Sequence, residues 1–141
     1  MTGYPKWFSQ NLITLVFTAV FLTGLFLIPN MFELRFGIEN DVVLKGFLRL
    51  ATMSTHVLFS YVILMILASL AIIHIKSGLK KKKNVISGLT IVASLFLLLF
   101  TGLMLLYAGN ELAIQISSLL HTLIGLIIFF VYVVHLNYKK H

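Results

Sequence analysis

The sequence contains no cysteine and very little charge. Without cysteine the chain cannot form disulfides, bind iron–sulfur clusters through thiolates, or attach c-type haem through Cys-x-x-Cys-His. Only 11% of the 141 residues are charged and 60% are hydrophobic, whereas soluble domains are about one quarter charged. The composition therefore excludes a soluble catalytic domain, and we expect a single transmembrane domain over residues 1–141.

Four long apolar segments contain no Asp, Glu, Lys or Arg. Each is near or above the ~18 residues that cross a bilayer core. Because lipid offers the backbone no hydrogen-bond partner, we predict an all-α integral membrane four-helix bundle with short connections between antiparallel helices. The first segment has a single Lys before it and no clear small-x-small cleavage site, so we interpret it as a retained helix. The predicted helices span residues 12–29, 51–75, 85–108 and 112–136.

The net charge of +7 is distributed unevenly along the chain. One group of lysines falls at the N-terminus, the second connection and the C-terminus, which share one side of a four-helix protein. All the acidic residues fall on the opposite side. The positive-inside rule then predicts that both termini are cytoplasmic, in a bacterial-type inner membrane, and anionic lipid headgroups rather than nucleic acid account for the basic charge. The lysines of the first group are Lys6, Lys76, Lys80, Lys81, Lys82, Lys83, Lys139 and Lys140. The opposite side carries the acidic residues Glu33, Glu39, Asp41 and Glu111 together with the basic residues Arg35, Lys45 and Arg49.

A weak internal repeat links the two halves of the chain. LTGLFLIPNMFE (Leu22–Glu33) resembles FTGLMLLYAGNE (Phe100–Glu111), and a histidine-bearing helix follows each copy. The molecule is therefore interpreted as two related helical hairpins. Between the first two helices, residues 41–50 have apolar positions at helical spacing. They either lie at the membrane interface or extend the second helix outward.

Four of the five histidines lie inside the apolar segments. His56 and His74 are separated by about five whole helical turns, so they share one face of the second helix. His121 and His135 are separated by about four turns and lie within about 40° of each other on the fourth helix. These two helices run in the same direction. We therefore predict facing pairs at two depths, about 27 Å apart on the second helix and about 21 Å apart on the fourth.

Two imidazoles at each depth favour haem over a metal bound by side chains alone. Tetrahedral zinc needs four ligands, and no Cys, Asp or Glu lies nearby to complete the set. Haem iron needs only two axial ligands, because the flat, apolar porphyrin supplies the other four. The pattern predicts an outer b-type haem on His56 and His121, and an inner one on His74 and His135. A purely structural role as interhelical hydrogen-bond donors is the alternative. Small residues expected to give the porphyrins room are Gly24, Gly102 and Gly125 for the outer haem, and Ser87 and Gly88 for the inner one.

With this histidine pattern on alternate helices, and with Gly24, Gly102 and Gly125, the chain resembles the four-helix di-haem cytochrome b superfamily. That superfamily includes the membrane subunits of formate dehydrogenases and nickel–iron hydrogenases, and small bacterial cytochromes. The resemblance implies bis-histidine haems that pass electrons across the membrane and often exchange them with quinone. One departure is the longer histidine interval on the second helix, because the shorter interval of the fourth helix is the more typical one. Counting the shorter interval back from His74 leads to Ser60 rather than His56.

Three functions follow as hypotheses. The first is an electron-transfer subunit that connects a quinone pool to a redox protein partner in a larger complex. The second is a stand-alone quinone-linked oxidoreductase, and the third is a haem-free structural or transport subunit of a membrane complex. The polar residues considered for an outer quinone site are Glu33, Arg35, Arg49, Asn110 and Glu111.

Overall fold

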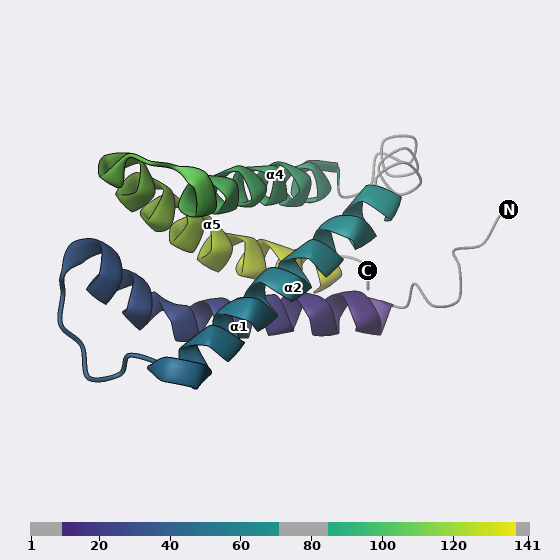
Figure 1. Ribbon diagram of the computed structural model, residues 1–141. Helices are drawn as coiled ribbons and strands as arrows, with labels where there is room; N and C mark the ends of the chain where they lie inside the picture. The colour runs from purple at the N-terminus through teal and green to yellow at the C-terminus, as the bar shows by residue number, and fades with distance from the viewer. Residues whose placement is uncertain (1–9, 71–84, 138–141) are drawn as a thin grey trace, which may run out of the picture.

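The structure is a computed structural model that describes residues 10–70 and 85–137. All regular structure in these two ranges is helical (Figure 1). Each helix is long and apolar enough to cross a membrane, so the all-α, four-helix prediction is confirmed and a multi-pass membrane protein is supported. The helices are α1 (Gln10–Phe36), α2 (Gly46–Leu70), α4 (Val85–Tyr107) and α5 (Glu111–Asn137).

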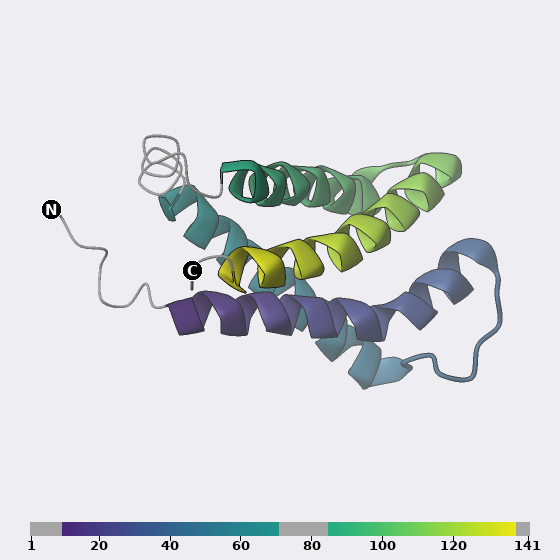
Figure 2. The ribbon, with the colours of Figure 1, turned by 180° about the vertical axis from the view of Figure 1, so that it is seen from behind.

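The helices alternate in direction. The connections formed by residues 37–45 and 108–110 lie at one end of the molecule, which we call the loop end (Figures 1 and 2). Helix α1 packs against both α2 and α5, and α4 packs against α5. Within the described ranges, α2 makes little direct contact with α5. The positions of the two histidine-bearing helices relative to each other therefore depend mainly on α1, while α5 also packs extensively on α4.

Helix α1 is longer than the apolar segment predicted. The predicted end was Pro29, but the helix continues to Phe36. Proline removes one backbone N–H donor, and membrane helices tolerate this loss where neighbouring groups compensate. The helix ends at Gly37, which has a φ of 66° and donates its N–H to the Glu33 carbonyl at 3.1 Å. This left-handed cap favours glycine because glycine has no Cβ to clash.

Helix α2 also begins earlier than predicted, at Gly46 instead of residue 51. Residues 46–50 therefore extend the helix towards the loop end. For these five residues, the alternative of an outward extension of the second helix is the one observed. The buried Asn30 side chain fixes the connection before it, donating to the Leu44 carbonyl at 2.8 Å and accepting from the Leu44 N–H at 3.2 Å. Residues 71–75 of the predicted helix lie outside the described residues.

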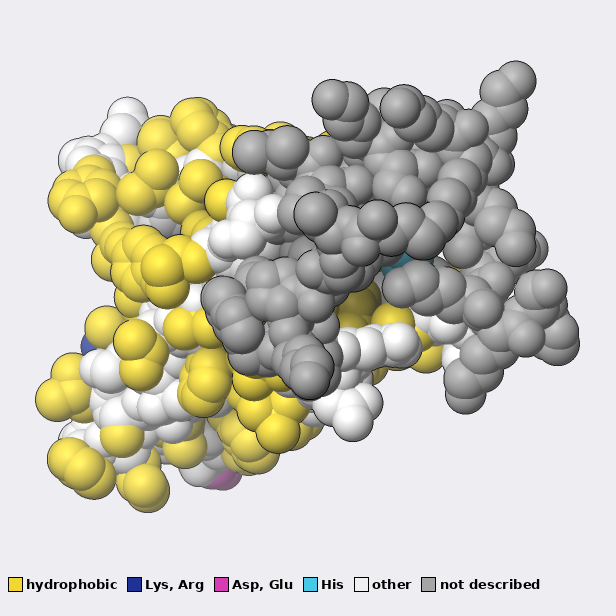
Figure 3. Space-filling model, turned by 90° about the vertical axis from the view of Figure 1, so that its right-hand side faces the viewer, with side chains coloured by type: hydrophobic (Ala, Val, Ile, Leu, Met, Phe, Trp, Pro, Cys, Tyr) yellow, Lys and Arg dark blue, Asp and Glu magenta, His cyan; other side chains and the backbone are white. Residues whose placement is uncertain are grey.

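The buried interior differs between the two halves of the bundle. In the half away from the loop end, all four helices contribute buried hydrophobic side chains. In the half near the loop end, the buried side chains of the described residues are all polar. Large hydrophobic side chains are exposed on all four helices, as expected for contact with lipid. Figure 3 views the bundle from the end opposite the loop end, where described hydrophobic side chains are visible beside the residues drawn in grey. The buried hydrophobic side chains away from the loop end are Val16, Phe17, Ile63, Ile66, Ile91, Leu95, Ile128 and Tyr132. The buried polar side chains near the loop end are Asn30, Thr101, Ser117 and Ser118.

Candidate functional site

The structure brings His56 of α2 and His121 of α5 together in the half of the bundle near the loop end. Their ring centres are 6.3 Å apart and their planes are inclined by 69°. The longer histidine interval on α2 therefore does not keep these two rings apart. Ser60, the position that the shorter interval would reach, donates its hydroxyl to the backbone carbonyl of His56 at 2.7 Å.

The Nδ1 atom of His56 is held by helix α1. It lies 3.1 Å from the Val20 carbonyl oxygen and 3.1 Å from Thr23 Oγ1. A carbonyl can only accept, and the Thr23 hydroxyl proton is directed to the Ala19 carbonyl at 2.7 Å, so Nδ1 is the donor in these contacts. A neutral imidazole protonated at Nδ1 has its lone pair at Nε2, the form that binds a metal through Nε2.

The Nδ1 atom of His121 is held in the same way by helix α4. It lies 2.9 Å from Thr101 Oγ1, and the Thr101 hydroxyl donates to the Leu97 carbonyl at 2.8 Å. Thr101 is therefore the acceptor, and its side chain is buried. Within the described residues, neither His56 nor His121 has a hydrogen bond at Nε2.

A glycine next to each threonine lies against the imidazole ring. A Cβ atom built on Gly24 would be 3.1 Å from His56 Cε1, and one on Gly102 would be 3.5 Å from His121 Cε1. The first distance is too short for a Cβ atom unless the ring moves. In this structure, Gly24 therefore makes room for the His56 ring, while the approach of His121 to Gly102 is an ordinary contact. Their predicted role beside a porphyrin stays a prediction.

His135 repeats the arrangement further along α5. Its Nδ1 lies 2.8 Å from Ser87 Oγ of α4, and a Cβ atom on Gly88 would be 3.8 Å from its Cε1. The predicted partner of His135, His74, lies outside the described residues. The structure therefore describes one complete histidine pair and one member of the second.

These contacts reveal hydroxyl residues whose role sequence reasoning missed: Thr23 and Thr101 were given no role, and Ser87 was expected only to make space. Three hydroxyl–glycine couplets fall within the described residues, and each meets a histidine of the next helix. The spacing of these residues in the sequence could have identified the contacts on α4 and α5. The interval between the two couplets on α4 equals the interval between the two histidines on the antiparallel α5, which keeps both contacts in register. The couplets are Thr23-Gly24, Ser87-Gly88 and Thr101-Gly102.

The spacing of the loop-end pair suits one metal held from two sides. Metal–imidazole bonds are about 2.0–2.1 Å long. With the ligating nitrogen about 1.2 Å from its ring centre, two opposed imidazoles have ring centres about 6.4 Å apart, close to the observed 6.3 Å. No group of three or more His, Cys, Asp or Glu side chains suited to a metal gathers among the described residues. A metal held by this pair would therefore take its remaining ligands from outside the described side chains, as a macrocycle would supply them.

The remaining predicted site residues lie in less specific surroundings. A Cβ atom on Gly125 would meet Leu98 Cδ2 of α4 at 4.0 Å, an ordinary contact. The Asn110 side chain accepts from the Ala113 N–H at 3.1 Å and so caps α5. The Arg35 carbonyl accepts from the Gln115 side chain at 2.9 Å and links α1 to α5.

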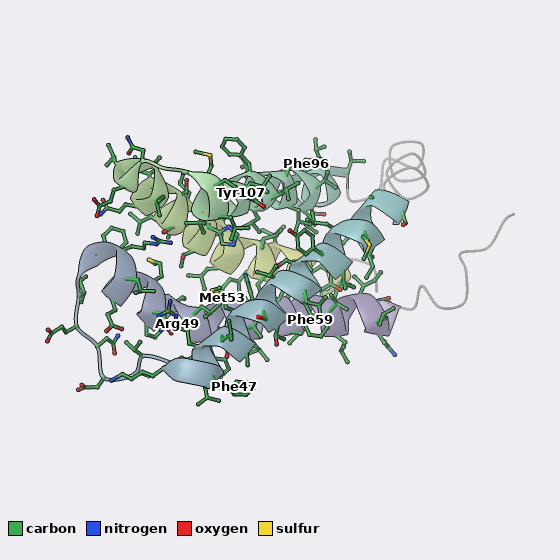
Figure 4. All side chains as sticks on the ribbon, viewed as in Figure 1. Phe47, Arg49, Met53, Phe59, Phe96 and Tyr107 are labelled. Atoms are coloured by element: carbon green, nitrogen blue, oxygen red, sulfur yellow. The ribbon has the colours of Figure 1, made fainter. Side chains whose placement is uncertain are left out.

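Arg49 lies about two turns from His56 on the same face of α2. It lines a recess at the loop end together with other residues of that helix. Figure 4 shows Arg49 and Met53 on the side of α2 opposite to Phe47, which points away from the bundle. The recess is lined by Gly46, Arg49, Leu50 and Met53.

Comparison with known proteins gives no assignment: no family model, no curated protein and no solved structure matches this chain.

Proposed function

We propose that this chain is a membrane di-haem b-type cytochrome that passes electrons between a quinone pool and a redox partner as a subunit of a larger complex. The observation that carries the proposal is the pair formed by His56 and His121, with ring centres 6.3 Å apart and with Nδ1 of each ring bonded to a threonine of another helix. Two ionisable side chains facing each other inside a membrane bundle are costly unless they serve a site. Haem, when bound, supplies the one-electron chemistry.

The distribution of buried side chains also supports a prosthetic group near the loop end. The buried hydrophobic cluster lies in the other half of the bundle, while the buried side chains described in the half of the histidine pair are polar. Helices α2 and α5 do not pack closely on each other in the described ranges. A flat macrocycle between His56 and His121 would supply the apolar contacts that these helices do not make directly.

The second haem rests on sequence spacing and on His135. In the proposal His74 and His135 hold a haem in the other half of the bundle. With the chain oriented by the positive-inside rule, this half is the cytoplasmic one. Along α5 the two ligand levels are about 21 Å apart, so electrons cross the membrane between two buried centres. The chain's own contribution is to bind, orient and bury them.

In the proposal, quinone binds among the described residues in the recess around Arg49 at the loop end. A guanidinium donates hydrogen bonds to a carbonyl oxygen and has no acceptor, while Leu50 and Met53 provide apolar contact. If the isolated chain oxidises a quinol and reduces a small acceptor unaided, it is the stand-alone oxidoreductase. If it needs a partner protein, it is an electron-transfer subunit.

A haem-free structural or transport subunit is the second candidate. It is favoured by the hydrogen bonds of His56, His121 and His135 to neighbouring helices, which a structural role for these histidines requires. These bonds use Nδ1, so they explain the orientation of the rings. They do not explain why two rings from different helices lie with their centres only 6.3 Å apart.

A reduced-minus-oxidised absorption spectrum of the purified protein decides between the two candidates. We expect a sharp b-type α-band and two haems per chain. His121→Ala and His135→Ala should each remove one haem, whereas His141→Ala, in the C-terminal tail, should retain both. A wild-type protein without this band contradicts the haem proposal, and retention of both haems in His121→Ala contradicts the pairing.

A further inference from the structure

The same contact occurs between three histidines and three hydroxyl–glycine couplets. In each case the hydroxyl lies 2.8–3.1 Å from Nδ1 of the imidazole, at His56, His121 and His135. The glycine that follows lies against the neighbouring ring atom, Cε1, with 3.1–3.8 Å to a built Cβ atom. Because the contact recurs at two depths and on two pairs of helices, a single accident of packing does not explain it.

The couplet works because of helical geometry. Adjacent residues on a helix are separated by about 100°, so one couplet presents a polar side chain and a bare Cα side by side. The imidazole places Nδ1 on the hydroxyl and Cε1 over the glycine. At Gly24 even a Cβ atom would need the ring to move, whereas at Gly102 and Gly88 a Cβ atom would be in ordinary contact with the ring. A glycine alone would leave Nδ1 without the hydroxyl.

The two threonines also link the imidazoles to backbone carbonyls. His121 Nδ1 donates to Thr101 Oγ1, which donates to the Leu97 carbonyl at 2.8 Å. His56 Nδ1 shares its proton between the Val20 carbonyl and Thr23 Oγ1, each at 3.1 Å, and Thr23 donates to the Ala19 carbonyl at 2.7 Å. In a chain of hydrogen bonds each bond strengthens the next. Electron density is therefore pushed towards Nε2, the nitrogen on the far side of the ring.

We infer that Thr23 and Thr101 are positioning residues that hold the imidazoles of His56 and His121 in the form protonated at Nδ1, Thr23 together with the Val20 carbonyl, and that they lower the reduction potential of the haem those histidines bind. This inference rests on the proposed function. A hydrogen bond at the outer nitrogen fixes the tautomer of a metal-bound histidine and makes it a more basic ligand. A more basic ligand stabilises the ferric state relative to the ferrous state, so the potential falls. Ser87 has the same place beside His135 in the other half of the bundle.

The test is a redox titration of the full-length haem protein carrying Thr101→Val. Valine keeps the shape and removes the hydroxyl. We expect both haems to stay bound, with the reduction equilibrium constant of one haem raised three- to tenfold, which is about 28–59 mV for one electron. Thr101→Ser should restore the wild-type value. Ser87→Ala should shift the other haem, and Thr90→Val, which removes an exposed hydroxyl of α4 bonded only to the Ile86 carbonyl, should shift neither.

The outcomes separate the inference from the proposed function. Unchanged potentials in Thr101→Val with both haems bound overturn the inference and leave the cytochrome intact. If Thr101→Val loses a haem, recovery of that haem and its potential in Thr101→Ser supports the inference, and failure to recover overturns it. If the wild-type protein binds no haem, the proposed function fails and the effect on potential fails with it. ¹⁵N NMR of the His121 ring in the haem-free chain then tests the tautomer alone, because an identical tautomer in wild type and Thr101→Val overturns that part as well.

Discussion

At the scale of single residues, glycines and hydroxyl residues determine where the histidines lie. A leucine-rich helix offers imidazole no polar partner, so each described membrane histidine is placed beside a Ser or Thr of a neighbouring helix. The adjacent glycine permits the approach. Small residues in membrane helices usually indicate close packing of backbones, and here they indicate close packing of rings on a backbone.

Gly24→Ala is expected to disturb the loop-end site. The added methyl group would lie 3.1 Å from His56 Cε1, and overpacking of this kind costs ~1–3 kcal/mol. Alanine is also a better helix former than glycine, and this difference offsets at most ~1 kcal/mol of the cost. We expect a net loss of about 1 kcal/mol in the free energy of unfolding and a lower occupancy of one haem, measured by denaturation in detergent and by absorption.

Gly125→Ala is the matched control, because its methyl group would meet only Leu98, at an ordinary 4.0 Å. The haem-free protein should keep its stability in this variant. If Gly125 gives the porphyrin room, as predicted from the sequence, haem occupancy falls while that stability does not. A Gly24→Ala protein with full haem content and unchanged stability would refute the proposed contact.

At the scale of helices and connections, α1 organises the bundle. It contacts both α2 and α5, stacks Phe17 on Tyr132 and Phe21 on Phe129 with ring centres 4.3 and 3.8 Å apart, and holds the first connection through Asn30. Its extension beyond Pro29 places Asn30 at the start of the added segment. The buried amide therefore links the longer helix to residues 37–45.

Asn30→Ala should loosen the loop end. The substitution removes two hydrogen bonds and leaves the N–H and carbonyl of Leu44 without that partner, which costs ~1–3 kcal/mol for a buried group. Hydrogen exchange of residues 37–45 should increase, and the unfolding free energy should fall by about 1–3 kcal/mol. Asn40→Ala removes a single exposed contact, to the Val42 N–H at 2.9 Å, and should have a much smaller effect. Equal effects of the two substitutions would contradict the role of Asn30.

At the scale of the whole molecule, the distribution of charge along the chain predicts the orientation in the membrane. The acidic residues Glu33, Glu39, Asp41 and Glu111 lie at or next to the loop end, and the lysine-rich segments adjoin the opposite ends of the helices in the sequence. From this distribution the positive-inside rule predicts that the loop end lies outside the cytoplasm.

Single-cysteine labelling tests this orientation directly, because the natural chain has no cysteine. In right-side-out vesicles, Asp41→Cys and Glu111→Cys should react with a membrane-impermeant maleimide. Lys81→Cys should react only after the vesicles are opened. Labelling of Lys81→Cys in sealed vesicles, with protection of Asp41→Cys, would mean that the orientation is reversed.

The sequence alone determined the number, type and approximate position of the helices, because hydrocarbon imposes a minimum apolar length and full internal hydrogen bonding. It also placed His56 and His121 at one depth, because helical rise and alternating direction are fixed. Helix ends were less predictable. Pro29 is a strong stop signal in water, and the cap at Gly37 depends on the backbone conformation that the following connection adopts.

Only the tertiary structure decided which neighbour each histidine meets. The repeat identified Thr23-Gly24 and Thr101-Gly102 as equivalent, but spacing along a helix does not say which way an imidazole turns. That choice depends on the packing of α1 on α2 and of α4 on α5, which brings one hydroxyl within reach of each Nδ1. The physical reason is range: helix periodicity is set by neighbours a few residues apart, whereas the hydrogen bonds of His56 and His121 join residues 33 and 20 positions apart in the chain.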